Sequence, residues 1–466
     1  MTRIGTLLAL VFGVLFGALL CFLSVAKVAI VAVGFVLLLV LLQYPLLGLL
    51  LFAVTATSIP YTTVEVGLRT TVSEALLGMT WLGVAWQAFL GRYDRQLRWL
   101  STERALLALM LFSAVPFVVG QVIIAAPGSG AVNWVRWLLN LSVLFLVPLL
   151  LPDERARDRL LVALLLGNLL MLVVSIGYFL KDRNALGMLP LLTSLKYAHP
   201  EAVKDIFSGN YTRMASPWVH PNLTGGALAL FIPLALFYGW TQTGWRRWLG
   251  FAVALLGCAG LLLSISRGAI LALALVLLWL SARKVPYSGR IIGLAVVFGV
   301  LLVACYPPLQ ERLATMFSST NASTEVRMDE YTHFPEVMTR YPLGIGFKVD
   351  PPVPGSGLLG ISNLWLNFIY KMGIPGMLLF ILVTLRWWRE TRPRGPIPQV
   401  TRDNALWLGS SCGVAAALLT GLFDHYFSFT NVLIALFWLL LGLSLQQARA
   451  HPEFAGPETP PRTTPP

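Results

Sequence analysis

Uninterrupted apolar runs of about twenty residues recur along the whole chain, and they constrain the fold more than any other feature. A helical run of about this length crosses the hydrocarbon core of a bilayer. Only 12% of the residues are charged, against about 25% in soluble domains, so a soluble enzyme and a disordered chain are both excluded. The runs are too long for barrel strands, and a lone strand leaves its backbone unsatisfied in lipid. The sequence therefore predicts an all-α polytopic membrane protein.

The apolar runs predict about 12 to 14 transmembrane helices in a single transmembrane domain, residues 1–447. The first run is too long for a signal peptide and lacks a convincing cleavage site. The second and third flank Pro45 and could form one bent element. The predicted spans lie at about 5–26, 28–42, 44–58, 72–91, 104–126, 133–150, 158–180, 222–240, 246–263, 267–283, 290–306, 362–386, 404–423 and 428–446.

Arginines and lysines gather in alternate loops, which predicts the orientation of the chain. The net charge is +13, and the positive-inside rule assigns the basic loops to the cytoplasm, so no nucleic-acid partner is expected. By this alternation the two long loops, 181–221 and 307–361, are periplasmic, and the second is expected to cap a cavity. Loops of this length are uncommon unless they carry function. The Pro-rich tail, 448–466, is predicted to be disordered and cytoplasmic.

Two arginines stand where predicted outer loops enter the membrane. Arg213 precedes a His220-Pro-Asn222 turn at the start of a span, which could bind an anion. Arg267 lies in a Ser-Arg-Gly-Ala turn that joins two spans with almost no loop. A charge at such a position is costly unless it is paired or used. The alternative for both is an arginine whose side chain snorkels to the interface.

The second long loop contains a predicted helix, residues 324–340. On this helix Arg327, Glu330 and Tyr331 share one face by their i, i+3, i+4 spacing. His333 and Arg340 belong to the same segment. The alternative is a solvated surface helix with no role in chemistry.

Further polar residues interrupt the last spans. Asn363, Asn367 and Lys371 recur every four residues, so they form a stripe that lines either a helix interface or a cavity. Asp424 and His425 lie between the last two spans. They could be an acid–base pair at the outer face, or a simple polar turn.

The chain lacks the usual metal-dependent means of holding a diphosphate. No Asp-x-Asp pair and no phosphate-binding P-loop occurs, and the four cysteines show no metal-binding spacing. We therefore expect no metal and no cofactor. Several arginines at one membrane edge suit a diphosphate instead, because guanidinium stays charged and binds phosphate in bidentate fashion.

The order of these motifs resembles the superfamily of O-antigen ligases and Wzy-type O-antigen polymerases of bacterial inner membranes. The resemblance covers roughly residues 200–445. It rests on five motifs in this order: Arg213 with His220-Pro-Asn222, Ser266-Arg267-Gly268-Ala269, Arg327…Tyr331 with Pro342-Leu-Gly-Ile-Gly346, Asn363…Asn367 with Gly373-Ile-Pro-Gly376, and Gly421-Leu-Phe-Asp424. It implies about twelve helices, a large outer loop over a cavity, and a glycosyltransferase of GT-C-like type that takes glycan from undecaprenyl diphosphate. In the lipopolysaccharide ligases a histidine stands at the position of Ser362, so the chain departs from the ligase pattern there.

Three functions remain open at this stage. The first is a lipid-linked glycan polymerase or related transferase at the periplasmic face, which works without metal and whose Arg213, Arg267 and Arg327 hold the diphosphate. The second is a lipopolysaccharide O-antigen ligase acting on lipid A-core, and the third is a transporter or flippase of lipid-linked saccharide. The expected partners are the lipid bilayer, the undecaprenyl-diphosphate-linked glycan, and a glycan or lipid A-core acceptor. The candidate bases are His220, His333, Glu330 and Asp424, and the expected cavity residues are Asn222, Arg340, Asn363 and Asn367.

Overall fold

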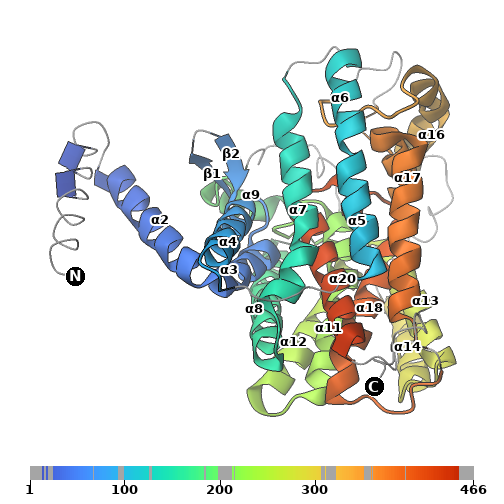
Figure 1. The fold of residues 1–466 in the computed structure, drawn as a ribbon. Helices are drawn as coiled ribbons and strands as arrows, with labels where there is room; N and C mark the ends of the chain where they lie inside the picture. The colour runs from blue at the N-terminus through green and yellow to red at the C-terminus, as the bar shows by residue number, and fades with distance from the viewer. Residues whose placement is uncertain are drawn as a thin grey trace, which may run out of the picture.

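The computed structural model is a bundle of long helices from which one N-terminal helix projects (Figure 1). It describes residues 13–14, 17–18, 25–66, 68–92, 99–124, 128–182, 185–197, 213–214, 216–305, 310, 322–350, 358, 360–393 and 395–450. The predicted first span therefore lies almost entirely outside the described residues. Most of the predicted tail does so too.

The helices of the first half begin and end close to the predicted spans. They are α2 (Val25–Gln43), α3 (Pro45–Ser58), α4 (Val72–Phe89), α5 (Ser101–Phe112), α6 (Ala114–Ile123), α7 (Ala131–Leu150) and α8 (Glu154–Asp182), followed by the short η1 (Ala185–Met188) and α9 (Leu189–Ser194). A small antiparallel hairpin, β1 (Thr63–Val66) and β2 (Leu68–Thr71), pairs Thr63 with Thr71 and was not predicted.

The second half holds the remaining helices. They are α11 (Pro221–Thr241), α12 (Gly244–Ser264), α13 (Arg267–Ala282), α14 (Ser288–Cys305), α16 (Ala322–Arg340), α17 (Leu364–Thr391), α18 (Arg402–Thr420), α19 (Tyr426–Phe429) and α20 (Leu433–Ala450). The predicted helix at 324–340 is thus confirmed as α16.

The all-α polytopic membrane fold is confirmed. Seven helices in the described part of the chain are long and apolar enough to cross a membrane, and four shorter apolar helices accompany them. The total of 12 to 14 spans stays a prediction. The chain breaks at Pro45, which begins α3 and separates it from α2, because proline has no N–H to continue a helix and is favoured in its first turn.

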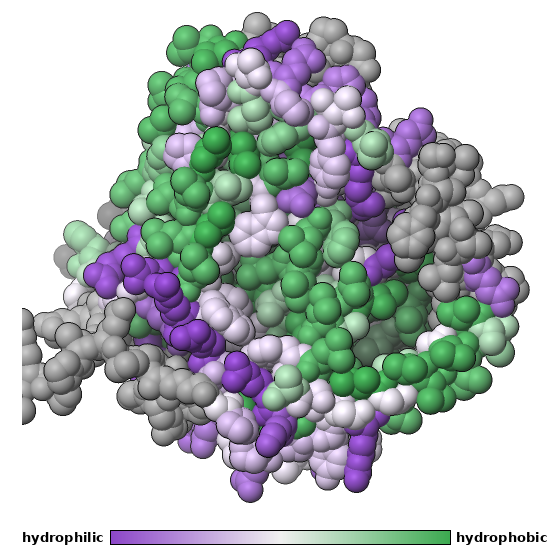
Figure 2. Space-filling view, turned by 90° about the vertical axis from the view of Figure 1, so that its right-hand side faces the viewer, coloured by the Kyte–Doolittle hydropathy of each residue, from purple (hydrophilic) through white to green (hydrophobic). Residues whose placement is uncertain are grey.

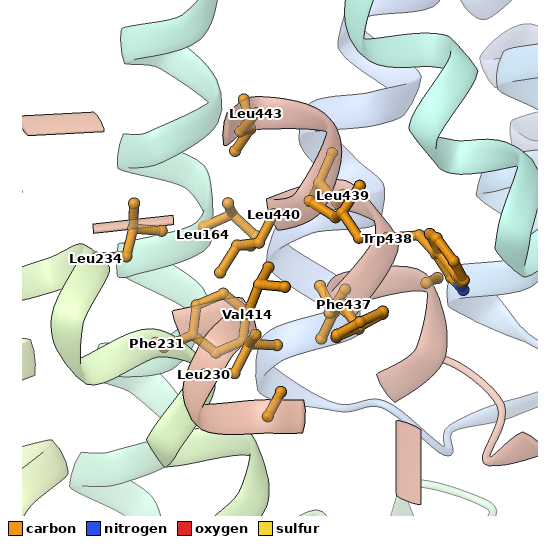
Figure 3. Packing of buried hydrophobic residues seen from close by; sticks show 14 of the residues in the cluster. Leu164, Leu230, Phe231, Leu234, Val414, Phe437, Trp438, Leu439, Leu440 and Leu443 are labelled. Atoms are coloured by element: carbon orange, nitrogen blue, oxygen red, sulfur yellow. The ribbon is translucent and has the colours of Figure 1, made fainter. Parts of the chain in front are cut away.

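The core lies where α8, α11, α18 and α20 meet. Figure 3 shows Leu164, Phe231, Val414, Leu440 and their neighbours interdigitating there, and all of these side chains are buried. Helix α11 packs against α12 and α18, and α20 packs against α7 and α18. This core holds α11 and α18 in place. The N-terminal end of α11 and the C-terminal end of α18 both lie at the candidate site.

The loop after α16 is fixed to a break in α17. Gly373 adopts φ 68° inside α17, and Pro375 has no N–H to bond the Lys371 carbonyl four residues earlier. That carbonyl accepts the Gly346 N–H at 3.0 Å instead, and the Tyr370 carbonyl accepts the Ile345 N–H at 2.9 Å. The two glycine-containing motifs therefore join, and they tie the C-terminal end of α16 to α17.

Candidate functional site

Polar residues from five segments meet around the loop that joins α18 to α19, residues 421–425. We call this group the junction site. Its members are Arg213, His220, Asn222, Arg267, Arg327, Glu330, Ser362, Asn363, Asn367, Asp424 and His425.

The N-terminal end of α11 contributes the first side chains. His220 caps the helix, because its Nδ1 accepts the Asn222 N–H at 3.2 Å. Arg213 donates from Nη2 to Asn222 Oδ1 at 2.5 Å and from Nε to the Ser264 carbonyl at 2.8 Å. Burial lowers the pKa of His220 to about 4, and the charges of Arg213 and His425 act in the same direction. The His220 ring is therefore neutral at neutral pH, as its acceptor role requires.

The turn between α12 and α13 brings Arg267 to the same place. Ile265 adopts a left-handed conformation, φ 51°, so the chain reverses within two residues. A Cβ on Gly225 would come within 2.2 Å of the Ser266 side chain, so glycine is needed for the turn to lie against α11. On the other side a Cβ on Gly268 would lie 3.1 Å from Phe423. Arg267 thus begins α13 beside the 421–425 loop.

One face of α16 covers the site. Arg327 donates from Nη2 to the Phe423 carbonyl at 3.0 Å. Glu330 accepts two hydrogen bonds from Ser362, and its side chain is almost fully buried. The Tyr331 hydroxyl reaches the Ser362 carbonyl at 3.4 Å. The predicted common face of Arg327, Glu330 and Tyr331 is confirmed, and it meets α17 and the loop.

Burial raises the pKa of the Glu330 carboxyl, while the two hydrogen bonds from Ser362 oppose that shift. Both Ser362 donors stabilise the ionised form. Both oxygens of Glu330 are already engaged by one neighbour.

Both asparagines at the start of α17 have structural partners. Asn363 caps α17 by accepting the N–H groups of Trp365 and Leu366, and its Nδ2 donates to the Leu422 carbonyl at 3.1 Å. Asn367 is buried and donates to the Ser428 hydroxyl at 2.8 Å. Of the two interpretations of the polar stripe, the contacts of Asn367 favour the helix interface.

Asp424 and His425 form a polar pair at the centre of the junction site. Asp424 Oδ1 accepts the His425 N–H at 3.0 Å and lies 3.6 Å from His425 Nδ1, and the Tyr426 hydroxyl donates to Oδ2. Asp424 is 9% exposed, and burial raises the pKa of its carboxyl against the opposing effects of His425 and Tyr426.

The other two predicted residues of α16 make different contacts. His333 Nδ1 lies 3.0 Å from Asp329 Oδ1, and Arg340 forms an exposed ion pair with Glu336 at 3.7 Å. Both pairs lie within α16, so the contacts of these two residues do not connect them to the junction site. Within the described ranges no group of three His, Cys, Asp or Glu residues could hold a metal ion.

The pairing of Ser362 with Glu330 was not foreseen from the sequence. From the sequence, His425 was considered only as one half of a possible acid–base pair or polar turn with Asp424, and not among the four candidate bases. The signal for His425 was available, because it adjoins a motif that carries the family resemblance.

Comparison with known proteins bears on the part of the chain that builds this site. No curated protein matches the chain. Residues 251–381 match the family model described as O-antigen ligase, and this segment includes Arg267, α16 and the first two thirds of α17. The match confirms the predicted resemblance and supports a multi-pass membrane glycan ligase or polymerase. Residues 251–381 of this chain are therefore similar to the O-antigen ligase family.

Proposed function

We propose that the protein transfers or polymerises glycan from an undecaprenyl-diphosphate-linked donor at the periplasmic face of the bacterial inner membrane. A hydroxyl of the acceptor sugar attacks the anomeric carbon of the donor. The bond from that carbon to the diphosphate breaks, and undecaprenyl diphosphate leaves. The reaction needs positive charge at the leaving diphosphate and a group that accepts the hydroxyl proton.

The observation that carries the proposal is that Arg213, Arg267 and Arg327 lie at two adjoining segments, the turn at residues 264–268 and the loop at residues 421–425. Arg213 donates to the carbonyl of Ser264, three residues before Arg267, and Arg327 donates to the carbonyl of Phe423, which packs on Gly268. The three arginines therefore come from three different segments: the residues before α11, the first residue of α13, and α16. We propose that they hold the diphosphate and stabilise its charge as it leaves.

The hydrophobic side of the molecule also suits a polyprenyl-linked donor. Figure 2 shows a face whose hollowed central area is largely hydrophobic, with hydrophilic residues at its top and lower left. A lipid carrier can approach such a face from the bilayer.

One experiment tests the function directly. Purified protein is given a defined undecaprenyl-diphosphate oligosaccharide, alone or together with lipid A-core. Longer glycans on the lipid carrier would identify a polymerase, and glycan on lipid A-core would identify a ligase. If neither product forms and the donor is bound but unchanged, a transporter would be the better account of the protein.

A further inference from the structure

We propose that His425 accepts the proton of the attacking hydroxyl and that Asp424 is a positioning residue for its ring. The inference rests on the proposed function, because it assigns the base of the transfer reaction. In the step the hydroxyl oxygen bonds to the anomeric carbon and its proton passes to His425 Nε2. The electrons of the broken carbon–oxygen bond leave with undecaprenyl diphosphate.

The exposure of the His425 ring is uneven. Its Nδ1 is buried and forms no hydrogen bond within the described part of the chain, although Asp424 Oδ1 lies 3.6 Å away. The side chain as a whole is 32% exposed, so its accessible surface lies away from Nδ1. A base that serves an external hydroxyl needs this arrangement, with one nitrogen facing the protein and the other facing the substrate.

Gly360 keeps space beside the outward nitrogen. A Cβ built on Gly360 would lie 3.7 Å from His425 Nε2 and 3.8 Å from Asn367 Oδ1. Its φ of 146° also disfavours other residues. A larger side chain here would extend toward Nε2, whereas glycine leaves room for a sugar hydroxyl.

The Asp424 carboxylate is held in place on both oxygens. Its Oδ1 accepts the His425 backbone N–H, and its Oδ2 accepts the Tyr426 hydroxyl. It is almost fully buried. Such a carboxylate can orient an imidazole and stabilise the imidazolium that forms, as the aspartate of a catalytic triad does. The slight closing of the 3.6 Å gap that this requires is typical when a substrate binds.

The other candidate bases are committed elsewhere. Both oxygens of Glu330 accept hydrogen bonds from Ser362. His220 Nδ1 caps α11, and burial lowers the pKa of this ring to about 4. His333 pairs with Asp329 within α16. Among the candidates, His425 is the one whose outward edge is open and whose inward edge faces a carboxylate.

Several titratable and charged groups lie near His425. They are Asp424, Glu330, His220 and, beside Asp424, Arg327.

The test compares His425→Ala with wild type in the purified full-length protein. Two quantities are measured separately: transfer from undecaprenyl-diphosphate oligosaccharide, and binding of that donor. We expect transfer to fall by about 10²–10⁴-fold, the usual contribution of a general base, while donor binding stays within about threefold. Added imidazole should restore part of the transfer, because the missing ring leaves a space open to solvent.

A pH profile and a second variant separate chemistry from structure. Wild-type transfer should fall as the pH is lowered, because protonated imidazole cannot accept a proton, and His425→Ala should lose this fall. Asp424→Asn should reduce transfer without abolishing it. Transfer by His425→Ala near the wild-type rate would overturn the proposal. The proposal would also be overturned if His425→Ala lost transfer without rescue by imidazole, and if Glu330→Gln or His333→Ala was equally inactive while still binding donor. Absence of transfer by the wild type would instead refute the proposed function.

Discussion

Ser362 donates two hydrogen bonds to the Glu330 carboxylate, from its backbone N–H to Oε2 at 2.7 Å and from its hydroxyl to Oε1 at 3.1 Å. Ser362 stands at the position of the histidine in the ligases that the chain resembles. Here the residue fastens α16 to the start of α17. The Ser362 hydroxyl therefore has a structural partner. The Glu330 carboxylate beside it is engaged by that contact and does not replace the ligase histidine as a free base.

We expect Ser362→Ala to be mild. The variant loses the hydroxyl donor but keeps the backbone N–H, and one hydrogen bond contributes about 0.5–1.5 kcal/mol, or more when it ends on a charge. Transfer should fall by less than about tenfold. Chain-length distribution and transfer to lipid A-core are the measurements. An inactive Ser362→Ala that still binds donor would contradict this assignment, and a rise in lipid A-core transfer by Ser362→His would indicate a ligase that had lost its base.

Arg267→Ala should abolish transfer and donor binding while the fold remains. Arg267→Lys should also be impaired, because an ammonium cannot reproduce the guanidinium fork. Arg283→Ala is the matched control, since Arg283 lies at the other end of α13 and stacks on Trp279. Donor binding and thermal unfolding in detergent would be measured for all three. Wild-type activity in Arg267→Ala would remove this arginine from the diphosphate site.

The sequence predicted the long apolar helices well because lipid burial depends on local composition, which a twenty-residue window records. It also placed Arg327, Glu330 and Tyr331 on one face, since helical spacing is local too. It could not predict that Glu330 meets Ser362, because the partners are 32 residues apart and the turn geometry between them decides the contact. Helix existence followed from the pattern, whereas side-chain pairing depended on tertiary packing.

A second contact that the sequence did not predict lies inside the membrane domain. Glu74 is buried at the start of α4 and accepts two hydrogen bonds from Arg136 of α7, at 2.6 and 2.9 Å, and one from Asn140. Each residue interrupts an apolar run, but nothing local in the sequence indicates that they pair. The hairpin before α4 brings Thr71 to the same carboxylate, which completes a capping box.

We expect Glu74→Gln to destabilise the protein strongly. The substitution leaves Arg136 partly buried without a charged partner, and breaking a buried pair in this way costs about 3–5 kcal/mol. Glu74→Gln combined with Arg136→Gln should recover part of the loss, because no lone charge remains. Thermal unfolding in detergent for both single variants and the double variant forms the cycle. Additive losses would show that the two residues act independently.

The orientation prediction can be tested at exposed positions on the described helices. Thr332 lies on the outer surface of α16, and Arg155 lies in the first turn of α8. In a cysteine-free background, Thr332→Cys should react with a membrane-impermeant maleimide in cells whose outer membrane is permeabilised. Arg155→Cys should react only after the inner membrane is opened. The reverse pattern would place α16 in the cytoplasm and end the proposed periplasmic site.

The last prediction uses the depressed pKa of His220. The folded protein holds this ring at a pKa of about 4, whereas an unfolded chain titrates near 6.5. Above about pH 6.5 both states are neutral and the stability contributed by the neutral ring is complete. As the pH falls toward 4, the unfolded chain binds a proton at His220 and the folded protein does not. The contribution of the neutral ring to the free energy of unfolding is therefore lost.

His220→Asn isolates this effect, because asparagine is a strong N-cap but does not titrate. Burial raises the pKa of Glu330 and Asp424, so these carboxyls act in the opposite sense and remain in both proteins. As the pH is lowered from 6.5 to 4.5, the melting temperature of the wild type should therefore fall relative to that of His220→Asn. Melting curves in detergent across this range give the difference directly. If the difference stayed constant, or moved in favour of the wild type, the His220 ring would not be the buried neutral cap described here.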